Sequence, residues 1–339
     1  CAGLALLSKY TAALGIAGAV LYLLTQPNDR QWLLRVEPYA AAVIALALFS
    51  PVLIWNAQHD WASFAFQGGR ADGARIHLLA PFLTLAGEAL FLLPWIWLPL
   101  MLVLVRAVRA GPERRGSWLL CCVGAVPIVF FFVVAFWARD RVAFHWAAPG
   151  YLMLFPLLGR EIAAKLGRGN RNARLRFGAS ALLIATTFLI VASEVRWNWL
   201  PEAIEQFAGG ADPDIAAVDW TSVRRQLAER GIPDAETPAI ATLRWYDAGK
   251  LDYALRGSVP VICLGNDPRE YGIVGDADRF RGRNLLIVAP RMTPTDIESR
   301  IGPLFERIET LPSLTLVHGG REVMTIPLFR GVGLRRPPP

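Results

Sequence analysis

The residues best able to do chemistry in this sequence are polar and charged side chains that interrupt or border long apolar runs. The stretch "IWNAQHDWASFAFQGG" (54–69) places Asn56, His59 and Asp60 among aromatic residues that include Trp61. Proteins bind sugars with such groups, because a ring stacks on the sugar while polar side chains bond its hydroxyls. An aromatic belt at a membrane interface would explain the tryptophans alone. The pattern therefore predicts a sugar or acceptor site made by Asn56, His59, Asp60 and Trp61.

Cations close to apolar runs form a second candidate group. In "ARDRVAFHWAAPGYL", Arg139 and Arg141 precede His145, and Lys9 lies inside "GLALLSKYTAALG". A guanidinium fits a phosphate group well, and a cation within a membrane span is costly enough to indicate a functional partner. Pairing of the arginines with Asp140 and snorkelling of Lys9 to the interface are the structural alternatives. We predict a donor-phosphate site made by Lys9, Arg139, Arg141 and His145.

Other reactive residue types give weaker signals. Glu88 lies in the apolar run "LTLAGEALFLL", where a carboxylate either lines a cavity or is a partly hydrated structural group. No two of the four cysteines have metal-ligand spacing, and Cys263 is typical of a buried strand residue. The sequence contains no Walker A, dinucleotide-binding or serine-nucleophile motif. We therefore predict neither a metal site nor a cofactor.

Long apolar runs are the elements that must position these residues. A helix needs about 20 apolar residues to cross a bilayer, and the sequence predicts about six such helices. The predicted spans are 2–24, 38–55, 78–105, 118–137, 146–158 extended through 162, and 177–195. Prolines at 81, 94 and 99 predict a kink or a break in the third span. The predicted fold class is a polytopic α-helical membrane protein with a small C-terminal α/β domain.

The short loops predict the orientation in the membrane. The loops after the first, third and fifth spans carry twelve Lys and Arg residues, whereas the loops on the other side carry four. Loops rich in Lys and Arg stay in the cytoplasm, so residues 54–69 and 139–145 are predicted to face outward. The formal net charge of +7 is explained by these loops, and no nucleic-acid-binding motif accompanies it. Nucleic acid is therefore not a predicted partner.

From Trp197 the sequence takes on an α/β pattern. "AIATL", "VPVICLG" and "NLLIVAP" predict short strands, and "LTLVHGGREVMTIPLF" predicts two more strands around a turn. "DWTSVRRQLAERG" predicts a helix with Asp219 as its N-cap, and "TPTDIESRIGPLFERI" predicts another. The predicted domains are a transmembrane domain over 1–196, an α/β domain over 197–335 and a disordered tail over 336–339.

Four segments together resemble one family. They are "GLALLSKYTA", "PVLIWNAQHDWASFAFQ", "HWAAPGYLMLFPLLG" and, in the α/β part, "PVICLGNDPREYG". In this order they are similar to bacterial glycosyltransferase family 39. Its members are polytopic enzymes of the GT-C fold, related to dolichyl-phosphate-mannose–protein mannosyltransferases and to lipid A aminoarabinose and galacturonic acid transferases. The resemblance runs from the first residues to near the end of the chain.

The resemblance implies a multi-pass protein of the bacterial inner membrane that works without a catalytic metal. Such a protein transfers a sugar from a polyprenyl-phosphate donor to a lipid A-like or protein acceptor at the periplasmic face. The family's catalytic carboxylate lies in a loop after an earlier span, so we expect the chain to lack its N-terminal helices and to be inactive alone. The transmembrane domain is then GT-C-like, and the catalytic base is not among these residues.

Two other readings of the sequence stay open. A transporter or flippase for lipid-linked sugars also needs charges within spans and polar outward loops, but no pairing of sequence halves is visible here. A membrane-anchored binding module would use the α/β domain as its functional part. That domain shows no evident site in the sequence, so we expect it to recognise the acceptor or to act as a structural cap.

Overall fold

The computed structural model shows two compact units, Cys1–Gly178 and Ala179–Pro339. The residues that it describes are 1–69, 73, 75–138, 142–197, 199, 219–232, 234, 236–273, 275, 277–318 and 321–335. Arg139, Arg141 and the predicted tail 336–339 lie outside these residues. The predicted domain boundary between residues 196 and 197 stays a prediction. The division between the units falls inside a helix.

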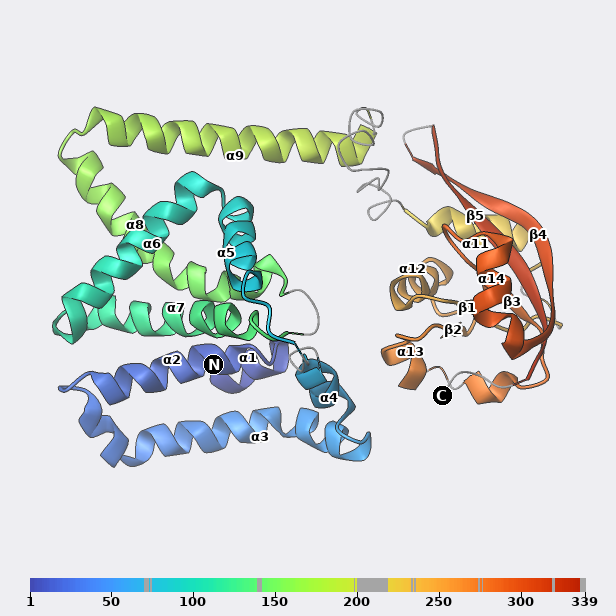
Figure 1. The fold of residues 1–339 in the computed structure, drawn as a ribbon, viewed down its shortest axis with the longest axis horizontal. Helices are drawn as coiled ribbons and strands as arrows, with labels where there is room; N and C mark the ends of the chain where they lie inside the picture. Colours follow the sequence, from blue (N-terminus) through green and yellow to red (C-terminus); the bar gives the residue numbers. More distant parts are fainter. Residues whose placement is uncertain are drawn as a thin grey trace. The chain divides into compact units, whose positions relative to one another are not determined.

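The first unit is helical (Figure 1). Its α-helices are α1 (Ala2–Ser8), α2 (Ala12–Thr25), α3 (Val36–Gln58), α4 (Ala62–Gly69), α5 (Ala80–Phe91), α6 (Pro94–Ala110), α7 (Arg115–Val134) and α8 (Ala148–Gly167). Short 3₁₀ helices are η1 (Arg30–Leu34), η2 (Gly111–Glu113) and η3 (Phe144–Ala147). Helix α9 (Arg171–Trp197) contains the division between the units.

The structure has helices long and apolar enough to cross a bilayer. In the described part of the chain they are Val36–Gln58, Pro94–Glu113, Arg115–Val134 and Arg171–Trp197. Two apolar helices are shorter, Ala12–Thr25 and Ala80–Phe91. A mostly helical membrane protein with a small sheet domain is therefore the observed class. The predicted count of about six spans stays a prediction.

The first predicted span was expected to be one continuous helix over 2–24, and this prediction is wrong. Helix α1 ends at Ser8, and α2 begins at Ala12. Lys9 between them has an extended backbone, with φ of −161° and ψ of 132°. The apolar pattern predicts burial in a membrane but does not report such a break, because no proline or glycine marks residues 9–11.

The third predicted span divides as its prolines predict. Helix α5 ends at Phe91, and α6 begins at Pro94. Leu93 adopts a φ of 68° before Pro94, and Pro99 lies inside α6 without ending it. A proline at the first position of a helix removes no intrahelical hydrogen bond, whereas an upstream helix cannot pass through it without losing one.

Helix α7 forms the centre of the helical unit. Helices α2 and α8 both pack against it, and small residues let the backbones approach. A Cβ on Gly18 of α2 would lie 2.5 Å from the Cα of Val123, and a Cβ on Gly150 of α8 would lie 2.5 Å from the carbonyl oxygen of Gly124. Buried core side chains include Leu100, Phe131 and Leu154. This close packing fixes the ends of α2, α7 and α8 relative to one another.

Polar contacts join the loops at one end of the unit, on the left in Figure 1. We call this the basic end, because it carries the twelve Lys and Arg residues of the loops after the first, third and fifth predicted spans. Gln26 Nε2 donates to the carbonyl of Pro112 at 2.6 Å, and Arg115 lies 3.1 Å from the carboxylate of Asp29. The structure thus brings these loops together at one end.

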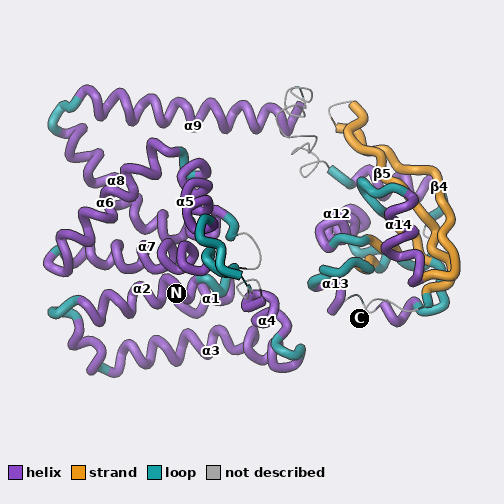
Figure 2. The backbone as a smooth tube through the Cα atoms, in the orientation of Figure 1, coloured by secondary structure: helices purple, strands orange, loops and turns teal. Residues whose placement is uncertain are grey.

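The second unit contains a five-stranded sheet in the order β2-β1-β3-β5-β4. Its strands are drawn in orange in Figure 2. The strands are β1 (Ile240–Thr242), β2 (Val261–Cys263), β3 (Leu285–Val288), β4 (Phe305–His318) and β5 (Arg321–Leu334). The helices are α11 (Thr221–Glu229), α12 (Trp245–Leu255), α13 (Glu270–Ile273), α14 (Pro294–Ile301), η5 (Ala277–Phe280) and η6 (Gly302–Leu304). Strands β2, β1 and β3 run parallel, and β5 is antiparallel to both β3 and β4.

Two apolar cores lie on opposite faces of this sheet. Successive strand residues face opposite sides, so Ile240 joins the core with α11 and α12, whereas Ala241 joins the core with α14. Helices thus cover both faces, as a parallel sheet requires. The predicted strands are all present, and Cys263 is buried in β2 as predicted.

Of the two predicted helix starts in this unit, that of α14 is confirmed and that of α11 is displaced. Thr293 caps α14 in a capping box with Asp296, which agrees with the predicted helix entry. The prediction of Asp219 as N-cap is wrong by one residue, because the cap position belongs to Trp220. Asp219 still binds the start of α11, since its carboxylate accepts from the backbone N–H of Thr221 at 2.9 Å.

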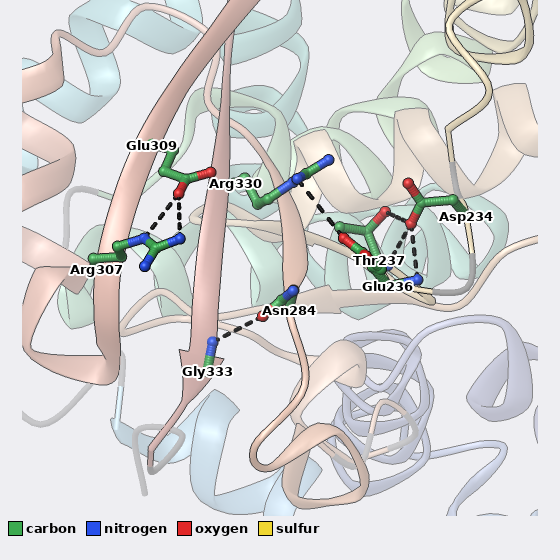
Figure 3. Close-up of polar contacts among 8 residues, drawn as sticks. All are labelled: Asp234, Glu236, Thr237, Asn284, Arg307, Glu309, Arg330 and Gly333. Carbon is green, nitrogen blue, oxygen red and sulfur yellow. Dashed lines mark hydrogen bonds and ion pairs between the residues drawn. The ribbon is translucent and has the colours of Figure 1, made fainter.

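Polar contacts brace the edge of the sheet where its parallel strands begin (Figure 3). Before β1, the carboxylate of Asp234 accepts from the backbone N–H and the hydroxyl of Thr237, both at 2.7 Å, and these bonds lower its pKa. Before β3, Asn284 accepts from the N–H of Gly333 at 3.1 Å. Hydrogen bonds within the chain thus hold the segments of the amino edge in place.

Candidate functional site

The break at Lys9 lies at the end of the helical unit opposite the basic end. Tyr10, the next residue, has its hydroxyl 2.9 Å from Ser63 Oγ in α4. Its ring stacks on Phe64 with centroids 5.1 Å apart and meets Phe49 edge-on at 5.9 Å. Lys9 itself is exposed. Sequence reasoning singled out Lys9 but missed Tyr10, the residue that ties the break to α4.

Asn56 holds the turn between α3 and α4 in place. Its side chain is fully buried, and Asn56 Oδ1 accepts from Ser63 Oγ at 2.7 Å and from the Ser63 backbone N–H at 3.2 Å. Its Nδ2 donates to the carbonyl of Val52 at 2.9 Å. Both ends of the amide are therefore used inside the chain. The structure gives Asn56 a positioning role.

The turn after α3 presents the other predicted residues. The His59 ring stacks on Trp55 with centroids 4.3 Å apart, and its Nδ1 lies 2.8 Å from the Trp55 carbonyl oxygen. Asp60 and Trp61 follow with φ values of 52° and 57°, in the left-handed region that costs a non-glycine residue energy. Both side chains are exposed, Trp61 by half. This turn aims Asp60 and Trp61 away from the bundle core.

The prediction of a loop from Asn56 to Gln67 is wrong for most of these residues. Helix α3 continues through Gln58, and residues 62–69 form helix α4. Only residues 59–61 form the turn, and the backbone N–H of Trp61 donates to the carbonyl of Asn56 at 2.8 Å. Side-chain capping by Asn56 supports this tight reversal, which residue types alone do not predict.

The segment that carries His145 is anchored by its neighbour. The ring of Phe144 fills a notch at Gly87 of α5, where a Cβ would lie 2.1 Å from a ring carbon. Val142 is buried, whereas His145 in η3 is exposed. Phe144 and Gly87 are positioning residues that sequence reasoning missed. The glycine before an intramembrane glutamate was the available signal.

Glu88, next to this notch, is buried in a hydrogen-bond chain. Tyr151 Oη donates to Glu88 Oε2 at 2.6 Å, and Trp97 Nε1 donates to Tyr151 Oη at 3.0 Å. Glu88 and Tyr151 are 2% and 1% exposed, so neither faces solvent. This chain links α5, α6 and α8, and it supports the structural alternative for Glu88.

Those predicted site residues that the structure describes lie on segments at one end of the helical unit, which we call the hinge end. It lies on the right side of the unit in Figure 1, where α3 ends, α4 follows, and α7 ends. The structure brings the Lys9 break to the Asn56–Trp61 turn through Tyr10. Phe144 places the segment that carries His145 against α5, and Arg139 and Arg141 lie outside the described residues. In the described chain, no group of three His, Cys, Asp or Glu side chains could hold a metal ion.

Residues 1–55 match the family of the dolichyl-phosphate-mannose-protein mannosyltransferases. The matched segment contains α1, the break at Lys9, α2 and most of α3. Neither the curated proteins nor the solved structures give a match. The family match supports a membrane glycosyltransferase of the GT-C superfamily, which in general uses a lipid-linked sugar donor and an acceptor.

Proposed function

We propose that this protein is a glycosyltransferase of the bacterial family 39 type that moves a sugar from a polyprenyl-phosphate donor to a lipid or protein acceptor. The family match over residues 1–55 supports the reaction class. The hydrogen bond between Tyr10 and Ser63 carries the assignment of the site, because it joins the Lys9 break to the turn that presents Asp60 and Trp61.

The donor phosphate is assigned to Lys9, Arg139, Arg141 and His145. When the bond between the anomeric carbon and the phosphate oxygen breaks, negative charge builds on the leaving phosphate. Preorganised cations stabilise that charge. Exposed Lys9, on an extended segment between two apolar helices, suits a phosphate whose isoprenoid tail lies in the bilayer.

The sugar or acceptor is assigned to His59, Asp60 and Trp61, with Asn56 positioning the turn. The exposed face of Trp61 is suited to stacking on a sugar ring, and Asp60 accepts hydrogen bonds from hydroxyls. His59 is held by its stacking on Trp55. None of these residues is assigned as the general base.

The proposal places the basic end in the cytoplasm and the hinge end at the periplasmic face of a bacterial inner membrane. The gathering of the Lys- and Arg-rich loops at one end supports this orientation. The α/β domain over 197–335 is then periplasmic, and the acceptor is a lipid of the lipopolysaccharide (lipid A) type or a protein. Labelling of single cysteines at His59 and Lys165 tests the orientation, and a His59→Cys thiol reached only from the cytoplasm contradicts it.

The deciding experiment removes the two arginines that are assigned to the phosphate. In membranes of cells that make the protein from its own gene, Arg139→Ala/Arg141→Ala should reduce transfer of radiolabelled sugar to the acceptor at least about 100-fold, as loss of preorganised charge stabilisation does. The matched control is Arg109→Ala/Arg114→Ala, two exposed arginines at the basic end. Normal transfer by the first variant, at equal protein level, removes the phosphate assignment.

Assays on the same membranes distinguish a transferase from a transporter or flippase. A transferase makes a covalent acceptor–sugar product and releases polyprenyl phosphate. A flippase moves the intact donor across the bilayer without a product. Movement of the donor with no acceptor product contradicts the proposed reaction.

A further inference from the structure

A second charged cluster lies in the α/β unit, where its parallel strands end. Strand β1 is followed by α12 on one face of the sheet, and β3 is followed by α14 on the other. Because β2 and β3 flank β1 on opposite sides, the chain changes direction between β1 and β3. Ligands of open α/β sheets bind at such a switch point, outside the carboxyl ends of the strands.

Three cations from two segments lie near this position. Arg244 follows β1 as the N-cap of α12, Lys250 lies on α12, and Arg291 follows β3. All three act electrostatically on the carboxylate of Asp247. A close approach fixes the loop after β1, since a Cβ on Gly265 would lie 1.8 Å from the carbonyl oxygen of Leu243.

Asp247 is a buried acceptor that the described chain leaves without a donor. It is 6% exposed, and its carboxylate makes neither a hydrogen bond nor an ion pair with the described residues. Burial raises its pKa to about 6, although the three cations lower it. Burying a carboxylate without a donor costs stability, so a ligand hydroxyl that donates to Asp247 would offset part of this cost.

Aromatic rings flank the cluster and are held by two arginines. Arg244 Nη1 donates to the Tyr246 hydroxyl at 2.6 Å, and Tyr246 remains 40% exposed. The guanidinium of Arg269 lies 3.9 Å from the centre of the Trp245 ring, and Arg269 pairs with Asp267 at 3.3 Å. These contacts hold Trp245 and Tyr246 at the edge, and the Tyr246 ring remains partly exposed. The amino edge carries the contacts of Figure 3.

We infer that the carboxyl edge of β1 and β3 binds a sugar phosphate. Arg244, Lys250 and Arg291 with Asp247 carry a net charge of +2, which matches a phosphomonoester of about −2 near neutral pH. A sugar hydroxyl supplies the donor that Asp247 lacks, and the ring lies against Tyr246. The phosphorylated sugar or polyol is either a free molecule or a lipid headgroup. The site does not depend on the proposed transfer reaction.

Hydrogen exchange of the full chain in phosphatidylcholine nanodiscs tests this site. Glucose 6-phosphate should protect the backbone amides of residues 244–250 and 291–293. A parallel arm uses nanodiscs that contain phosphatidylinositol 4-phosphate, which presents a polyol phosphomonoester on a lipid. Protection by the soluble probe identifies a free ligand, and protection by the lipid alone identifies a headgroup. Either result supports the site.

Two substitutions test whether the protection by the ligand depends on the charged cluster. Arg291→Gln should weaken binding roughly tenfold, as expected for loss of one charge-assisted contact. The matched control is Arg256→Gln, since Arg256 is also exposed, also has a positive φ (57° against 59° for Arg291), and lies at the opposite end of α12. Unchanged hydrogen exchange of the β3 amides in both variants shows that the α/β fold is retained. If Arg291→Gln disturbs the fold, Arg244→Gln takes its place in the same test.

Three results overturn the inference. The first is that neither probe protects these amides. The second is that Arg256→Gln weakens binding as much as Arg291→Gln. The third is that inorganic phosphate binds as tightly as glucose 6-phosphate, because Asp247 then has no hydroxyl to accept. All three are measured without sugar transfer, so failure here leaves the proposed reaction to its own test.

Discussion

The two ends of the helical unit are built in different ways. At the basic end, the ion pair Arg106–Glu161 at 2.6 Å joins α6 to α8, and Arg115–Asp29 at 3.1 Å joins the start of α7 to the loop after α2. At the hinge end, ring stacking and neutral hydrogen bonds around Asn56 hold the turn, and Lys9 forms no ion pair with the described residues. A scaffold that uses neutral contacts leaves its charges available for a ligand.

The α/β unit repeats this contrast at the two edges of its sheet. The amino edge uses its carboxylates in hydrogen bonds within the chain, as at Asp234. At the carboxyl edge, Asp247 is buried without a donor among the described residues. In both units, therefore, polar contacts within the chain hold one end, and the other end carries a charged side chain, Lys9 or Asp247, that forms no ion pair with the described residues. The following substitutions test that contrast.

The largest expected effect is on the neutral network of the hinge end. Asn56→Leu removes the acceptor of Ser63 and should lower the stability of the full chain in detergent by about 2 to 3 kcal/mol. Thermal unfolding by circular dichroism measures it. The control is Asn28→Leu, because Asn28 is exposed at the basic end. Equal effects of the two substitutions contradict the structural role of Asn56.

A similar effect with a defined pH dependence is expected at Asp247. Its folded pKa of about 6 exceeds the usual 3.8, so the folded state binds more protons between about pH 4 and 6. Stability of the α/β unit should therefore fall as pH rises through this window. Asp247→Asn should abolish the fall and stabilise the unit above pH 6 by up to about 3 kcal/mol.

The thiol of Cys263, buried in β2, reports this unfolding. Its labelling by dithiodipyridine in urea, located by mass spectrometry in the full chain, gives the stability at each pH. A stability that rises from pH 4 to 6 in the unsubstituted protein has the wrong sign for a buried, unpaired Asp247. If the stability of Asp247→Asn falls with pH as much as that of the unsubstituted protein, the pH dependence belongs to another group.

An intermediate effect is expected at the exposed cation of the hinge end. Lys9→Met should weaken binding of polyprenyl phosphate in nanodiscs about tenfold, because one charge-assisted contact is lost. The matched control is Lys165→Met, an exposed lysine of α8 near the basic end. Fluorescence titration measures both. Equal affinities of the two variants remove Lys9 from the donor site.

The smallest expected effect is at the basic end. Arg106→Gln breaks the pair with Glu161, in which the two side chains are 58% and 29% exposed. Exposed pairs contribute about 1 kcal/mol or less, and salt screens them. The loss in melting temperature should therefore be small and should vanish at high salt. A large loss in melting temperature that does not depend on salt contradicts the contrast between the two ends.

The sequence predicted the elements whose pattern is periodic and local. The apolar runs predicted α3, α7, α8 and α9 because membrane burial demands long uninterrupted helices. Alternating and apolar runs predicted the strands of the α/β unit, and Pro94 predicted the break before α6. The boundary residue of α11 was misplaced by one, since Asp219 and Trp220 both lie before the helix.

By itself the sequence determined which residue types border the membrane runs, and so which chemistry is available. Only the tertiary structure decided that the helix breaks at Lys9, that Tyr10 reaches Ser63 across 53 positions, and that Asn56 is buried. It also decided that Arg244, Lys250 and Arg291 converge on Asp247. These outcomes depend on contacts between distant segments, and local patterns of residue type carry no information about which segments meet.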